Sequence, residues 1–157
     1  MANKYLKKGI LAILYFVMVV LGIMLIITLL SFVIFSSYTF SFKTLMSGCI
    51  SIVYIFSYFI VVRRLIFIIN SVYYTPFIWD NVKNFKIIGW CLVINAILEC
   101  LIGYGSGRKH FFQIIATKNG ALTPMVIVCI IAALMSFVIA EVFEKAIKIK
   151  EDNDLTI

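Results

Sequence analysis

Apolar residues dominate four long stretches of the chain, and polar residues collect between them. The stretches cover residues 9–35, 44–62, 87–103 and 124–140. A transmembrane helix needs about 20 consecutive apolar residues, with a lower limit of roughly 17, so each stretch is long enough to cross a bilayer. Helices satisfy their own backbone hydrogen bonds in lipid, and the apolar residues are continuous rather than alternating as in barrel strands. The pattern predicts an all-α integral membrane bundle of four transmembrane helices, as a single transmembrane domain over residues 1–157.

Two of the helices are expected to extend beyond their apolar stretches. The second should continue past its two arginines to about Asn70. The fourth has a favourable start, because Thr123 can cap a helix and Pro124 suits the first helical position. Glu-before-Lys pairs four residues apart favour its continuation, Glu141–Lys145 and Glu144–Lys148. The fourth helix is therefore predicted to run unbroken beyond the membrane to about Lys150 as a cytoplasmic extension.

The composition agrees with a lipid environment. The chain is 64% apolar and 13% charged, whereas soluble domains average roughly 45–50% apolar and about 25% charged. Lysines before the first stretch resemble the start of a signal peptide. The apolar core of a cleavable signal, however, spans only roughly 7–15 residues and is followed by a small-residue cleavage site. The first stretch is therefore predicted to be a membrane anchor.

The distribution of basic residues predicts how the chain is threaded. In a four-span arrangement, ten of them fall on one side, namely Lys4, Lys7, Lys8, Arg63, Arg64, Lys83, Lys86, Lys145, Lys148 and Lys150. Four fall on the other, namely Lys43, Arg108, Lys109 and Lys118. The positive-inside rule places the larger set in the cytoplasm, so both termini are expected on the cytoplasmic side of the membrane. Basic residues between apolar stretches suit anionic lipids, so direct nucleic-acid binding is not expected.

Glu99 is the only carboxylate well inside an apolar stretch. It shares a stripe with Cys91, Asn95 and Gly103 because these residues recur every four positions. A carboxylate is costly in lipid, so the stripe is expected to face protein. Candidate partners at the same depth are Thr28, Ser31, Ser47, Ser51 and Tyr54. Two interpretations stay open for Asn95 and Glu99: hydrogen-bonded packing residues, or an intramembrane polar site that senses a ligand.

The cytoplasmic segment before the third stretch is expected to form an amphipathic helix, beginning at Thr75 and Pro76 and placing Trp79 at headgroup depth. Connectivity should bring this segment next to the tail of the fourth helix. Together they form a candidate partner-docking surface: Pro76, Phe77, Asn81, Val82, Lys83, Phe85, Phe143, Ile147 and Asp154. The same residues suit packing of the loop helix against the tail, and the sequence leaves both interpretations open.

Signatures of catalysis and metal binding are missing from the sequence. His110 is the single histidine and has no cysteine or carboxylate at ligand spacing. The chain contains no Walker sequence, nucleophile elbow or HExxH motif. The four cysteines lie inside apolar stretches without metal-binding spacing, which is typical of reduced packing residues. We therefore expect no enzymatic activity, no cofactor and no metal.

Two segments carry a family resemblance. The first is Pro76-Phe77 followed by Asn81-Val82-Lys83 and Ile88-Gly89-Trp90, and the second runs from Ala140-Glu141-Val142-Phe143 to the terminal Asp154-Leu155-Thr156-Ile157. In these segments the chain resembles a family of small bacterial membrane proteins, the domain-of-unknown-function family twenty-nine seventy-five. The resemblance implies four spans in a bacterial plasma membrane and frequent encoding beside a small Cro-like helix-turn-helix regulator. It implies no catalytic residues.

Two functional hypotheses follow. The first is a membrane-embedded regulatory or interaction protein that signals to, or restrains, a small cytoplasmic helix-turn-helix transcription regulator. The alternative is a transport-associated or self-immunity membrane protein. The neighbouring gene distinguishes them, because a helix-turn-helix regulator favours the first and an exporter or peptide precursor favours the second.

Overall fold

Four long helices make up almost all of the computed structural model, which describes residues 2–38, 42–72, 77–105, 115–117 and 120–154. They are α1 (Ala2–Tyr38), α2 (Phe42–Val72), α3 (Trp79–Gly105) and α4 (Pro124–Asp154). All four are long and apolar enough to cross a membrane, which confirms the predicted class of fold. Each predicted span falls within one helix.

A short antiparallel hairpin interrupts the connection between α3 and α4. Its strands are β1 (Ile115–Thr117) and β2 (Gly120–Leu122), and Ala116 pairs with Ala121. These strands were not predicted from the sequence, because each has only three residues, which is too few to show an alternating pattern. Their placement on a helical bundle leaves the fold class unchanged. His110, which belongs to the same connection, lies outside the described residues.

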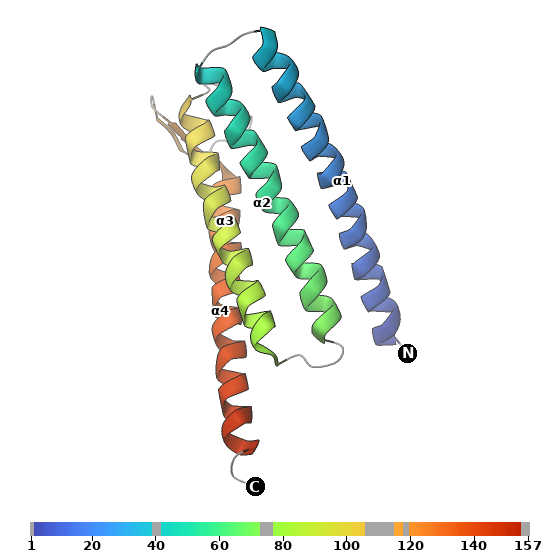
Figure 1. Cartoon of the computed structure of the whole chain (residues 1–157). Coiled ribbons are helices and arrows are strands. Elements are labelled where there is room, and N and C mark those ends of the chain that lie inside the picture. The colour runs from blue at the N-terminus through green and yellow to red at the C-terminus, as the bar shows by residue number, and fades with distance from the viewer. Residues whose placement is uncertain (1, 39–41, 73–76, 106–114, 118–119, 155–157) are drawn as a thin grey trace.

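Consecutive helices pack side by side in an antiparallel row (Figure 1). α1 packs mainly against α2, whereas α2 packs against α3 and α3 against α4. The most apolar part of α1 is not buried inside the protein, so its surroundings in a membrane are lipid. The first residues of α1 and the last residues of α4 lie at the same end of the bundle (Figure 1). That end is called the terminal end below, and the opposite end the hairpin end.

The two expected helix extensions are present. α2 continues past both arginines to Val72, and α4 continues without a break to Asp154. The amphipathic segment, predicted to lead into the third span, forms one continuous helix with that span, and this helix begins at Trp79 rather than at Thr75 and Pro76. At the start of α3, the backbone N–H of Asn81 donates to the backbone carbonyl of Ile78. Asp80 in the first turn complements the helix dipole.

Small side chains let the helices approach closely. On α4 the buried residues recur every three or four positions and are mostly small: Val126, Cys129, Ala133, Ser136 and Ala140. On α3, a Cβ built at Gly89 would lie 2.7 Å from the ring of Phe137, so the glycine accommodates this ring. Gly48 of α2 accommodates Phe32 of α1 in the same way. Contacts through small residues are the usual basis of helix packing in lipid, where apolar surface alone gives no preference.

Candidate functional site

The C-terminal part of α4 lies along the first turns of α3 at the terminal end. Val82 of α3 and Ile147 of α4 are 2% and 4% exposed, and they form one apolar cluster with Ala140. Phe143 packs between two rings of the α3 segment, 5.5 Å from Phe77 and 5.6 Å from Phe85 between ring centroids. The predicted proximity of the two segments is therefore confirmed.

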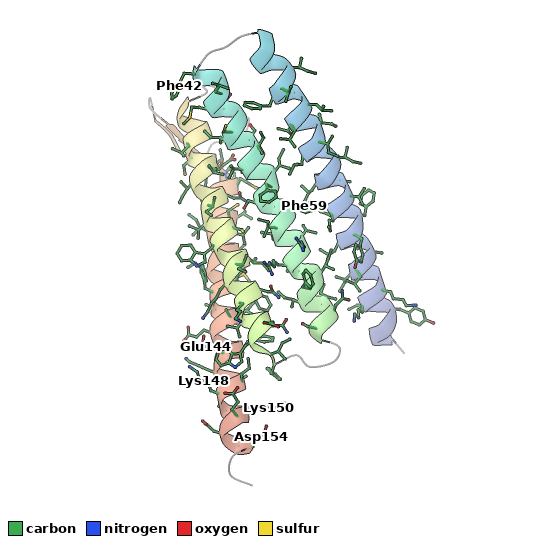
Figure 2. All side chains as sticks on the ribbon, in the orientation of Figure 1. Phe42, Phe59, Glu144, Lys148, Lys150 and Asp154 are labelled. Atoms are coloured by element: carbon green, nitrogen blue, oxygen red, sulfur yellow. The ribbon has the colours of Figure 1, made fainter. Side chains whose placement is uncertain are left out.

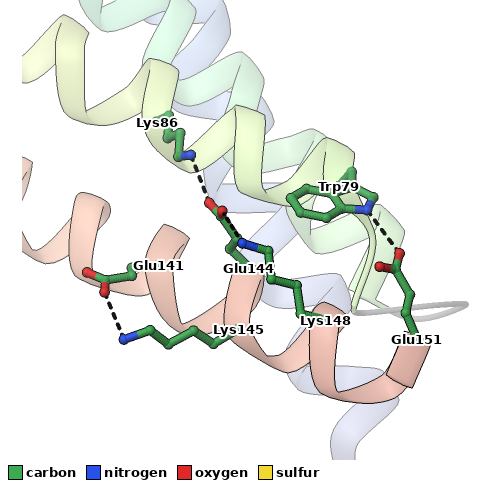
Figure 3. Close-up of polar contacts among 7 residues, drawn as sticks. All are labelled: Trp79, Lys86, Glu141, Glu144, Lys145, Lys148 and Glu151. Atoms are coloured by element: carbon green, nitrogen blue, oxygen red, sulfur yellow. Dashed lines mark hydrogen bonds and ion pairs between the residues drawn. The ribbon is translucent and has the colours of Figure 1, made fainter. Parts of the chain in front are cut away.

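Charged and polar contacts surround this apolar cluster (Figure 3). Glu144 accepts hydrogen bonds from Lys86 on α3 at 3.0 Å and from Lys148 on α4 at 3.1 Å. Two helical turns further along both helices, the indole N–H of Trp79 donates to Glu151 at 3.2 Å. The two contacts that join α3 to α4, Lys86–Glu144 and Trp79–Glu151, are called the clasp below. Lys145 pairs with Glu141 of its own helix at 2.9 Å (Figure 3).

The clasp lies beyond the apolar part of α4, which ends at residue 140. There the ammonium groups of Lys86 and Lys148 hold the pKa of the Glu144 carboxyl below its ordinary value, mainly through their hydrogen bonds. The same cause, a hydrogen bond and attraction from Lys145, lowers the pKa of Glu141. Both carboxylates are therefore ionised at neutral pH, and Glu144 provides the negative charge shared by the two lysines.

α2 joins this end of the molecule through polar side chains. Asn81 is fully buried, and its side-chain oxygen accepts a hydrogen bond from the hydroxyl of Ser71 on α2 at 2.6 Å. The guanidinium of Arg64 donates to the carbonyl oxygen of Asn84 at 3.0 Å. Buried polar groups need such partners, and these contacts fix the rotation of α3 against α2. The ends of α2, α3 and α4 thus form one three-helix unit, called the terminal unit below.

The charged residues place the terminal unit outside the apolar part of the bundle. Lys86 and Gly105 are 19 residues apart on α3, and at a rise of about 1.5 Å per residue this is roughly 28 Å, close to the hydrocarbon thickness of a bilayer. Arg64 and Glu144 lie near the level of Lys86 through their contacts with α3. The charged C-terminal turns of α4 then project further, as Glu144, Lys148, Lys150 and Asp154 show (Figure 2).

The predicted docking residues divide between the interior and the surface of this unit. Asn81, Val82 and Ile147 are buried inside the chain, and Phe85 and Phe143 are half-buried. They are therefore unavailable, or only partly available, to a partner. The exposed members are Phe77, Lys83 and Asp154, while Pro76 lies outside the described residues. Val82 and Ile147 are buried because α3 and α4 cover each other's apolar faces at this end.

The clasp itself was missed by sequence reasoning. The Glu144–Lys148 spacing was visible in the sequence, but the contact from Lys86 joins residues far apart in the chain. Trp79, for which the sequence predicts headgroup depth, donates to Glu151 and is 40% exposed. The sequence does not indicate that Trp79 pairs with Glu151, because this pairing depends on how α3 and α4 align.

A second polar group of residues lies inside the apolar part of the bundle, nearer the hairpin end. Glu99 is half-buried on α3, and the hydroxyl of Thr123, just before α4, donates to its carboxylate at 3.4 Å. Glu99 therefore has a hydroxyl partner from another segment, although Thr123 was not among the candidates. Of those candidates, Tyr54 neighbours Glu99. The hydroxyls of Thr28 and Ser51 bond carbonyls of their own helices instead.

Polar contacts continue from Tyr54 toward α4. The rings of Tyr54 and Tyr58 meet edge to face with centroids 5.2 Å apart. The hydroxyl of Tyr58 lies 3.4 Å from the sulfur of Cys129 on α4. Asn95, one helical turn from Glu99, is fully buried, and neither its oxygen nor its nitrogen has a hydrogen-bond partner. Among the described members of the predicted stripe, Cys91, Asn95 and Glu99 thus face protein, where α2, α3 and α4 come together.

Other candidate chemistry is limited in the part of the chain that the structure describes. There, no group of three or more histidine, cysteine or acidic side chains could hold a metal ion. The four cysteines are free, with Cys91 and Cys129 buried. The two groups of polar residues described above, one in the terminal unit and one around Asn95, are therefore the candidate functional features.

A four-helix chain of this length and apolarity is a multi-pass membrane protein. Its sequence matches the family model described as "Protein of unknown function (DUF2975)" over residues 4–157, so the chain belongs to that family. The resemblance drawn from the segments around Phe77 and Phe143 is confirmed. No curated protein and no solved structure matches the chain.

Proposed function

We propose that the protein is a membrane-embedded regulatory protein whose terminal unit binds a soluble partner. The observation that supports this most is the extension of α4, which continues beyond the apolar part of the bundle and is held against α3 by the clasp. A transmembrane anchor alone needs no such extension. A rigid extramembrane unit attached directly to three spans can transmit a change in helix packing to a bound partner.

The exposed face of the terminal unit suits a reversible protein contact. Phe77, Trp79 and Ile149 are 47%, 40% and 62% exposed. Charged side chains of both signs are exposed on the same unit, including Lys83 and Asp154. Aromatic residues in the centre of a patch with a polar rim are the usual composition of protein interfaces. The partner proposed is a small helix-turn-helix regulator encoded beside this chain, as the family resemblance implies.

The orientation is part of this proposal. Ten basic residues lie on the side of the terminal unit and four on the other, which by the positive-inside rule places the unit in the cytoplasm of a bacterial cell. A transcription regulator is found in that compartment. Binding at the membrane would keep it from DNA, and a change in the bundle would release it.

The test is capture of the co-encoded regulator by the full-length protein in native membranes. Ile149→Asp changes the exposed face without touching the buried cluster, and Phe77→Ala removes the exposed ring. Val19→Ala, an exposed residue in the apolar part of α1, is the matched control. Capture by the parent and the control, with loss in the two surface variants at normal membrane levels, supports the proposal. Equal capture by all four proteins, or none by the parent, contradicts it.

A further inference from the structure

The side chain of Asn95 is the least satisfied polar group among the described residues. It is fully buried on α3, and neither its oxygen nor its nitrogen forms a hydrogen bond. Leaving a buried donor or acceptor without a partner costs about 1–3 kcal/mol for each group. Because both atoms are unpaired, exchanging the oxygen and nitrogen positions would not remove the cost. The site therefore requires an additional hydrogen-bonding group.

The chemistry of the carboxamide restricts what this group can be. The oxygen of Asn95 accepts hydrogen bonds and its nitrogen donates them. A bare metal cation would satisfy the oxygen and leave the nitrogen without an acceptor. Water both donates and accepts, and buried water typically bonds polar groups that the protein leaves unpaired. Water is therefore the ligand that fits both atoms.

Most of the polar side chains near Asn95 lie toward the hairpin end. Glu99 lies one helical turn toward the hairpin end, about 6 Å along the axis, and is partly exposed. The hydroxyls of Thr123, Tyr54 and Tyr58 belong to the same region. Cys129, which contacts Tyr58, packs beside Ala96.

The opposite direction is lined mainly by apolar side chains, and the buried hydroxyl of Ser57 there already donates to the carbonyl of Cys91 at 3.2 Å. Toward the terminal end, Val61, Ile88, Leu92 and Ala133 are buried in one cluster that also includes Cys91. Water is poorly accommodated among such residues, because apolar sites without polar partners stay dry. Asn95 thus lies at the boundary between a polar half and an apolar half of the helix interface.

We infer that Asn95 and Glu99, with Tyr54, Tyr58 and Thr123, form a water-binding site that opens toward the hairpin end and stops at the apolar cluster beside Cys91. Water would therefore reach these polar residues only from the side of the membrane at the hairpin end. This inference rests on the bundle interior and does not depend on the proposed partner of the terminal unit.

Two native cysteines provide the test, since they lie on either side of the boundary. The thiol of Cys129 belongs to the polar half and that of Cys91 to the apolar cluster. Two variants are prepared in lipid vesicles, each keeping one of these cysteines and carrying alanine at the other three. Infrared spectroscopy then follows the replacement of S–H by S–D after transfer into deuterated water.

The Cys129 thiol is expected to exchange its hydrogen for deuterium readily. The Cys91 thiol is expected to keep its S–H hydrogen over the same period. Adding Asn95→Leu to the Cys129 variant should abolish the rapid exchange, while far-ultraviolet circular dichroism checks that its helices remain. Slow exchange of Cys129 in the parent background overturns the inference, as does equally rapid exchange of both thiols. The comparison of the two thiols stays decisive even if Asn95→Leu does not fold.

Discussion

The ammonium of Lys86 lies 3.0 Å from the carboxylate of Glu144, joining α3 to α4 where both helices leave the apolar part of the bundle. The Glu144 side chain is only 27% exposed, whereas Glu141 pairs with Lys145 on its own helix and is largely exposed. A contact between two helices limits their separation, and one within a helix does not. Substitution of Glu144 should therefore weaken the contact between α3 and α4, whereas substitution of Glu141 should not.

Glu144→Gln is expected to loosen the first turns of α3 from the tail of α4. Amide hydrogen exchange should rise in residues 79–86, because local opening becomes easier when the contact is weakened. Glu141→Gln is the matched control and should leave exchange in this segment unchanged. Mass spectrometry of the protein in detergent measures both. An equal rise in the two variants would show that the Lys86 contact does not hold the segment.

Acid should weaken the same contact. The pKa of Glu144 is lowered in the folded protein by Lys86 and Lys148, so its stabilising effect is present at neutral pH and is lost as the pH falls through the lowered pKa. Exchange in residues 79–86 should therefore rise on acidification once corrected for the intrinsic rate. Glu144→Gln should remove this dependence, and its persistence in the variant would assign the effect to other groups.

The buried cluster of the terminal unit gives a prediction for stability. Ile147 is 4% exposed against Val82, whereas Ile149, two residues later, is 62% exposed. Ile147→Ala should lower the free energy of unfolding by about 2–5 kcal/mol, through lost apolar contact and the cavity left behind. Ile149→Ala should change it by less than about 0.5 kcal/mol. Unfolding in mixed detergent measures both, and similar effects would contradict the packing of α4 on α3.

The attachment of α1 depends on one glycine. A side chain at Gly48 of α2 would overlap the ring of Phe32, whereas a Cβ at Gly22 of α1 meets nothing within 4 Å. Gly48→Leu should therefore displace α1 and destabilise the protein by about 1–3 kcal/mol, as overpacking does. Gly22→Leu changes the same residue type in lipid-facing surroundings and should be nearly neutral. Thermal unfolding in detergent compares the pair, and equal melting temperatures would exclude a tight α1–α2 contact.

The orientation of the bundle can be tested with reporter fusions. The excess of basic residues at the terminal end predicts that a reporter fused after Ile157 is active in the cytoplasm. A reporter inserted at Gly105, at the hairpin end of α3, should be active only on the outer side. A periplasmic-type reporter that is active after Ile157 would reverse the proposed orientation and remove the cytoplasmic partner from consideration.

The sequence by itself determined the number of helices, their approximate bounds and the continuation of α4. These features follow from local properties: apolar stretches of about 20 residues, a threonine–proline start and Glu–Lys spacing. Each of them stabilises a helix whatever its neighbours are. The stripe through Asn95 and Glu99 was also visible, because a polar group avoids lipid and so indicates which face of its helix meets protein.

Only the tertiary structure decided which residues meet across helices. In lipid, apolar side chains cover every face of a helix, so the hydrophobic pattern does not reveal how it is rotated or aligned. Small residues such as Gly48, Gly89 and Ala140 set the close contacts, and these in turn fix the register of the longer side chains. The burial of Ile147, the pairing of Lys86 with Glu144 and the unpaired carboxamide of Asn95 all follow from that register.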